Sequence, residues 1–121
     1  MTTSFDEARR FLSLAADDLA ALPHIRPAIA FFHAQQAIEK NLKAVLFARG
    51  EEFRKTHDLY ELADRLAKTG FTLPYGADEL AQINPYAVEF RYGDETIQII
   101  IDTITRKMVS WAEASVGGMQ T

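Results

Sequence analysis

The stretch from Pro27 to Arg49 constrains the fold most, because it is long enough for a single helix and apolar on nearly every side. Pro27 suits the first turn of a helix, and Gly50 can end one in the left-handed conformation. At about 100° per residue, the largest side chains fall on one face. They are Phe31, Ile38, Leu42, Val45 and Leu46. The pattern predicts a long central helix against which other helices pack.

Proline and glycine residues divide the rest of the chain into further helical segments. Before Pro23, apolar residues repeat at steps of three and four, and Ser4 with Glu7 predicts a capping box at the start of that helix. Thr56 is expected to cap a short helix that ends at Gly70. Residues 78–84 allow only one short helix before Pro85.

The last predicted element begins at Gly93 and Asp94. Its apolar residues step by four, three, four and three, and they are Ile97, Ile101, Ile104, Met108 and Trp111. The β-branched residues 99–101 alone could form a buried strand, but the length of the pattern favours a helix.

Because the predicted connections are short, we expect an all-α fold, an antiparallel up-and-down four-helix bundle with one extra short helix. Residues 1–114 would form this single domain. Residues 115–121 contain two glycines and little to bury, which predicts a flexible C-terminal tail.

Composition excludes several classes of protein. Thirteen Lys and Arg against 17 Asp and Glu give a net charge of −4, which argues against a protein coated with basic residues for nucleic acid. The absence of cysteine excludes disulfides and thiolate chemistry. The acidic N-terminus and the lack of an apolar run of about 20 residues predict a soluble, cytoplasmic protein with no membrane association.

Catalytic motifs are scarce. The chain has no phosphate-binding glycine loop, no Gly-x-Ser-x-Gly turn and no His-Glu-x-x-His motif. No glutamate is followed by a histidine three positions later, as a di-iron bundle would require. We therefore expect neither a metal nor a cofactor.

Four segments together resemble the HEPN family, in the order that the family has them. They are an entry helix, the sequence Gln-x-x-Glu-Lys-x-x-Lys at residues 36–43, Thr-His-Asp-Leu at residues 56–59, and Arg91-Tyr92. The resemblance implies a small helical bundle that forms a homodimer. It also implies a minimal nucleotidyltransferase as the partner protein and a toxin–antitoxin type of module.

Many HEPN proteins that cleave RNA carry an Arg and a His separated by about four to six residues near the start of the last long helix. This chain has Arg91, but Thr96, Ile97 and Gln98 occupy the positions where the His would fall. We therefore expect a subunit that acts by binding, with no assigned catalytic residue. The alternative is a metal-independent endoribonuclease that uses Arg91 with His57 or His33.

Polar residues form a stripe on the long helix, at His33, Gln36, Lys40 and Lys43. Two interpretations stay open for this polar stripe. It is either a solvated face with a Glu39–Lys43 pair, or a groove that binds a nucleotide or RNA phosphate together with His57, Arg91 and Tyr92. His57 alone could simply belong to a helix start, and Arg91-Tyr92 could hold the last loop in place.

A homodimer is also expected from apolar surface, because the loops carry aromatic residues that four helices alone do not readily cover. The candidates for this surface are Phe47, Phe53, Phe71 and Tyr75.

Overall fold

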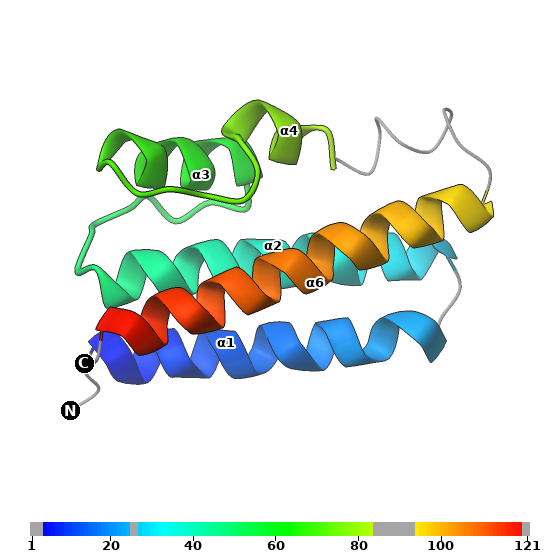
Figure 1. The fold of residues 1–121 in the computed structure, drawn as a ribbon, viewed down its shortest axis with the longest axis horizontal. Helices are drawn as coiled ribbons and strands as arrows, with labels where there is room; N and C mark the ends of the chain where they lie inside the picture. Colours follow the sequence, from blue (N-terminus) through cyan, green and yellow to red (C-terminus); the bar gives the residue numbers. More distant parts are fainter. Residues whose placement is uncertain (1–3, 25–26, 84–93, 120–121) are drawn as a thin grey trace.

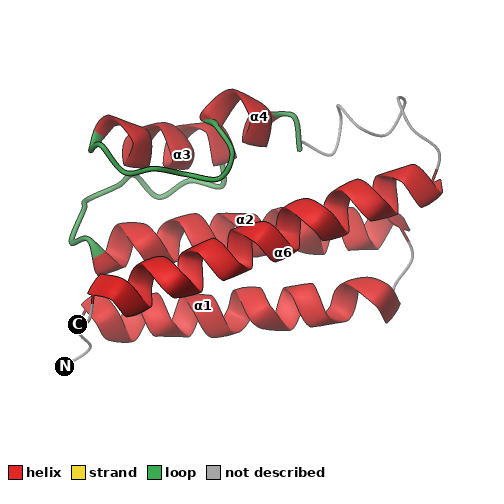
Figure 2. Ribbon diagram, in the orientation of Figure 1, coloured by secondary structure: helices red, strands yellow, loops and turns green. Residues whose placement is uncertain are grey.

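The computed structural model describes residues 4–24, 27–83 and 94–119, and these residues form helices joined by loops. The long helices are α1 (Ser4–Ala21), α2 (Pro27–Ala48) and α6 (Asp94–Met119); the shorter ones are α3 (Leu59–Lys68), α4 (Ala77–Ala81) and the 3-10 turn Leu22–His24. The described part of the chain contains no strand (Figure 2). The all-α class is confirmed, and residues 99–101 belong to a helix.

The three long helices pack against one another, and α3 with α4 forms a further layer on α2 (Figure 1). The start of α1, the end of α2 and the end of α6 lie at the same end of the molecule (Figure 1), so α2 and α6 both run opposite to α1. The predicted apolar face of α2, from Phe31 to Leu46, is buried. The stripe on α1 also packs into the core, with Ala8, Ala15 and Leu22 fully buried. The central position of α2 follows from these contacts.

Glycines end two of the helices, as predicted. At the end of α2, Gly50 has φ of 69°, its N–H donates to the carbonyl of Phe47, and Glu51 N–H donates to that of Leu46, both at 3.0 Å. The same pattern closes α3, where Gly70 has φ of 86°. Such paired bonds satisfy carbonyls that the helix leaves without partners.

The direction of α3 differs from the expected arrangement. His57, before the start of α3, contacts Glu39 in the middle of α2, whereas the carbonyl of Thr69, after its end, contacts Arg49 at the end of α2. Helix α3 therefore runs parallel to α2, and the antiparallel four-helix bundle is not confirmed. The reason is the connection: residues 49–58 run back along α2 in an extended loop rather than making a short turn.

Two helix boundaries also differ from the prediction. Asp58, not Thr56, caps α3: its carboxylate accepts from the N–H groups of Tyr60 and Glu61, while Thr56 accepts from the N–H of Asp58. Helix α6 continues through residues 115–119 rather than ending at Ala114, because Val116 is buried and Met119 packs against the core. None of the described helices is both long and apolar enough to cross a bilayer.

Candidate functional site

The polar stripe of α2 meets a carboxylate from α1. The side chain of Asp18 accepts from the Lys40 ammonium at 2.6 Å and from the Nδ1 of His33 at 2.9 Å, one on each of its oxygens. A carboxylate accepts but does not donate, so Nδ1 of His33 carries the proton in this bond. The acid, the lysine and the histidine form a cluster, termed here the Asp18 cluster, which joins two helices.

A second cluster, the Glu39 cluster, lies further along α2. Glu39 is only 8% exposed, and its carboxylate accepts from Lys43 at 3.0 Å and from the Nδ1 of His57 at 3.0 and 3.1 Å. The predicted Glu39–Lys43 pair is therefore present. His57 comes from the loop before α3, and its side chain is 85% exposed. The bond fixes one ring nitrogen while most of the imidazole stays in water.

The predicted site residues are thus divided. His33, Lys40, Lys43 and His57 belong to the two clusters, and Gln36 lies half-buried one turn before Lys40. Arg91 and Tyr92 lie outside the described residues. The described ranges contain no group of three His, Asp or Glu residues that could hold a metal ion.

Sequence reasoning missed Asp18, although the sequence contains a signal for it. Asp18 follows Ala15 by three residues and precedes Leu22 by four, and both are buried. An acid at that spacing lies on the packed side of the helix and needs a partner there. The cations of α2 are the candidates for that partner, and Lys40 supplies it.

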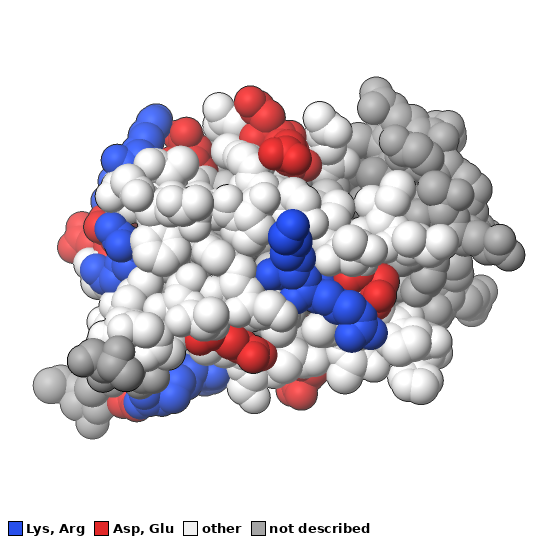
Figure 3. Space-filling view, viewed as in Figure 1, with Lys and Arg blue, Asp and Glu red and all other residues white. Residues whose placement is uncertain are grey.

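The two carboxylates change the electrostatics of the polar stripe. Lys40 and Lys43 carry two positive charges, and Asp18 with Glu39 carries two negative ones at bonding distance. A phosphate on this stripe would have to replace a carboxylate as the partner of each lysine. On the face drawn in Figure 3, basic and acidic side chains are likewise interspersed.

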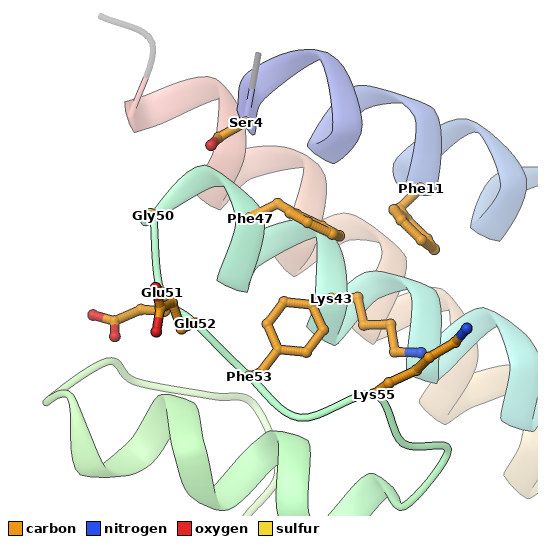
Figure 4. Close-up of a pocket in the computed structure, with 9 residues that line it drawn as sticks. All are labelled: Ser4, Phe11, Lys43, Phe47, Gly50, Glu51, Glu52, Phe53 and Lys55. Carbon is orange, nitrogen blue, oxygen red and sulfur yellow. The ribbon is translucent and has the colours of Figure 1, made fainter. Parts of the chain in front are cut away.

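A groove of about 690 Å³ lies beside the Glu39 cluster, between α1 and the loop that follows α2 (Figure 4). Phe47 stacks on Phe11 with ring centres 5.4 Å apart, and Phe53 meets Phe47 edge-on at 5.2 Å. Lys43 and Lys55 also line the groove. Near it, Arg54 pairs with Glu61; this hydrogen bond, aided by charge attraction, raises the pKa of Arg54.

The aromatic residues expected at a dimer surface make contacts within their own chain and are only partly exposed. Phe53 meets Phe47, Phe71 meets Trp111 edge-on, and Tyr75 lies 5.5 Å from the ammonium of Lys107. All four candidate aromatics are partly buried against the core. Large apolar side chains that are exposed lie elsewhere, at Ile29, Phe32, Tyr60, Ile99 and Ile100.

Comparison with protein families matches residues 1–114 of the 121 residues to the HEPN domain. Comparisons with curated proteins and with solved structures found no match. The match spans α1, α2, α3, α4 and most of α6, so it includes both carboxylate clusters. Since it covers far more than half of the sequence, the chain belongs to the HEPN domain family.

Proposed function

We propose that this chain acts by binding a protein, as the HEPN half of a two-component module of the toxin–antitoxin type. In this proposal it forms a homodimer and its partner is a nucleotidyltransferase-like protein. Family membership supports a role connected with nucleotides or RNA. The identity of the partner and the toxin–antitoxin role are proposals.

The observation that carries the proposal is an exposed apolar face at the start of α2. Ile29 and Phe32 are 45% and 54% exposed, and they are three positions apart, so they lie on one side of the helix. The Asp18 cluster begins beside them, since the ring of His33 meets that of Phe32 edge-on. Apolar residues next to satisfied polar groups are typical of protein interfaces.

Charge also favours a protein partner over free nucleic acid. The chain carries a net charge of −4, and the two lysines of the polar stripe are already paired with carboxylates. A surface that attracts nucleic acid depends on cations that are free to contact phosphates.

Copurification tests the proposal. The chain is expressed with a candidate nucleotidyltransferase-like protein, and the complex is measured by affinity capture and size exclusion. We expect a complex that Phe32→Glu weakens at least about five-fold, because a buried aromatic residue at an interface contributes more than about 1 kcal/mol. Tyr60→Glu changes another exposed aromatic residue, on α3, and is the matched control; it should leave the complex intact. No complex, together with strong RNA cleavage by the chain alone, would overturn the proposal.

A metal-independent endoribonuclease is the second candidate function, and the geometry of His57 favours it. Glu39 holds Nδ1 while the ring is largely exposed, which is how an acid orients a histidine for proton transfer. His57 also lines a pocket of about 290 Å³ with Gln35, Asp58 and Leu80. In this hypothesis Arg91 would supply the second functional group, and His33 is the alternative to His57 as its partner.

Cleavage of a labelled RNA in the presence of a chelator separates the two candidates. A ribonuclease of this type loses at least about 100-fold in rate in His57→Ala, the usual contribution of a general acid or base. His24→Ala, at an exposed position on the 3-10 turn, is the control. Equal rates for both variants would exclude His57 from catalysis.

A further inference from the structure

The groove between α1 and residues 50–55 has an apolar centre and opposite charges at its two ends. Phe47 stacks on Phe11 and meets Phe53 edge-on, so the three rings form one continuous apolar surface (Figure 4). Lys43 and Lys55 lie at one end, and Glu51 and Glu52 at the other, with Phe53 between the two ends. A volume of about 690 Å³ is within the range of sites that bind ligands.

Two of these charges are available to an incoming ligand. Lys43 is held by Glu39 at 3.0 Å, and Glu51 lies 3.3 Å from Arg65. In contrast, the side chains of Lys55 and Glu52 have no ion-pair partner within the described ranges, and both are exposed. An occupant can therefore satisfy one free cation and one free anion.

We propose that this groove binds a short linear peptide of a partner protein, with an acidic residue at the Lys55 end, apolar side chains over the phenylalanines and a basic residue at the Glu52 end. The inference rests on the proposed function, because it assigns a binding surface for the partner. The apolar centre would supply the affinity and the charged ends the orientation.

The charge pattern favours this occupant over a nucleotide chain. A base could stack on the phenylalanines while its phosphate contacts Lys55. The next phosphate of the chain would then lie near the carboxylates of Glu51 and Glu52, which repel it. A peptide can carry opposite charges at its two ends. Residues 52 and 55 are three positions apart in an extended segment, which is at most about 10 Å, so two apolar residues between the charges suffice.

Fluorescence anisotropy with labelled peptides tests this inference on the full-length protein. Three peptides share a central Phe-Phe pair and differ in the flanking residues, which are Glu and Lys, Glu and Glu, or Lys and Lys. We expect the mixed peptide to bind most tightly. Lys55→Glu should weaken it about three-fold and favour the Lys-flanked peptide, while Glu52→Lys should weaken it similarly and favour the Glu-flanked peptide.

The double variant Lys55→Glu, Glu52→Lys exchanges the two ends and should restore binding of the mixed peptide. Lys68→Glu, an exposed lysine on α3, makes the same change of charge away from the groove and is the control. Because the varied side chains are exposed, the variants should fold. No binding of the mixed peptide up to about 5 mM, or equal responses in Lys55→Glu and Lys68→Glu, would overturn the inference. A mononucleotide that binds more tightly than the mixed peptide would also overturn it.

Copurification with the nucleotidyltransferase-like protein separates this inference from the proposed function. A complex that forms but is unaffected by Lys55→Glu and Glu52→Lys would leave the proposed function standing and exclude the groove. If peptides bind with the expected charge pattern but no complex forms, the groove would stand as a peptide site and the proposed function would be excluded.

Discussion

The Lys40 ammonium lies 2.6 Å from the carboxylate of Asp18, and this contact joins the middle of α2 to α1. Both side chains are largely buried, so breaking this ion pair should cost more free energy than breaking an exposed one. His33 uses the other oxygen of the same carboxylate. Asp18 therefore stabilises the fold and sets the charge of the polar stripe.

Asp18→Asn should destabilise the protein by about 1–2 kcal/mol, because the amide keeps the size of the side chain but leaves Lys40 without a counter-charge. Urea unfolding followed by circular dichroism measures the change. Asp17→Asn, at the neighbouring exposed position, should change stability by less than about 0.5 kcal/mol. Equal effects of the two substitutions would show that the Asp18 contacts contribute little.

The same substitution should strengthen binding of phosphate-bearing ligands to the polar stripe. Removal of the Asp18 charge frees Lys40 and His33, so we expect the affinity for a mononucleotide to rise several-fold at low salt. Asp17→Asn changes the net charge equally and should have a smaller effect. Lys40→Ala with Lys43→Ala should weaken the binding and flatten its salt dependence. Titration calorimetry at two salt concentrations measures the affinity and its salt dependence for each variant. Unchanged affinity in the lysine variant would indicate that the polar stripe is a solvated face.

Alanine substitutions at two glycines should have opposite signs. Gly50 has φ of 69°, and a Cβ at this position would meet nothing within 4 Å, so Gly50→Ala should cost about 1 kcal/mol through backbone conformation alone. Gly117 lies inside α6 with equal free space, so Gly117→Ala should stabilise by up to about 1 kcal/mol. Thermal unfolding measures both. Destabilisation by Gly117→Ala would contradict the continuation of α6 beyond Ala114.

The sequence was informative wherever one helix determined the outcome. The apolar face of α2, the buried stripe of α1 and the closing glycines at 50 and 70 depend on local geometry and periodicity, and the structure has them as predicted. The direction of α3 was predicted wrongly, because it depends on the path of residues 49–58, and no local pattern specifies whether a loop turns or runs back along a helix.

The candidate site shows the same division. The stripe on α2 follows from helical spacing, and so does the Glu39–Lys43 pair. The contacts of Asp18 with His33 and of His57 with Glu39 join residues 15 and 18 positions apart, so they depend on how the elements pack. Spacing on α2 predicts the partner of Lys43, but only the packing of α1 reveals that Asp18 neutralises Lys40 as well.

Asn41 is fully buried on α2, and neither its oxygen nor its nitrogen has a hydrogen-bond partner within the described ranges. Asn41→Leu should therefore stabilise the protein by about 1–2 kcal/mol, since it removes two unsatisfied polar atoms and adds apolar contacts. Thr105→Val is the control, because the buried Thr105 hydroxyl already donates to the carbonyl of Ile101 at 2.6 Å. Its effect should be smaller. Urea unfolding compares the two, and a loss of stability in Asn41→Leu would indicate that the site needs the amide.

The dimer prediction now rests on α6 rather than on the loop aromatics. Ile99 and Ile100 are 67% and 37% exposed near the start of this helix, and pairing with a second copy would remove both from water. Light scattering at micromolar concentration should give a mass near 27 kDa, twice the chain mass of 13.6 kDa. Ile99→Lys should shift it towards the single chain, because a charge placed in an apolar interface without a counter-ion opposes association.

Tyr60→Lys is the control for that measurement, since Tyr60 is exposed on α3 and the substitution adds the same charge. It should leave the mass near 27 kDa. The two copies would use the same face, so each dimer contains the Ile99→Lys substitution twice and the loss of affinity is correspondingly large.

A biological interface should bury at least about 1,000 Å², more than two isoleucines provide, so neighbouring parts of α6 would have to contribute. A mass near 13.6 kDa for the unsubstituted protein would exclude the dimer, and a dimer unaffected by Ile99→Lys would place the interface on another face.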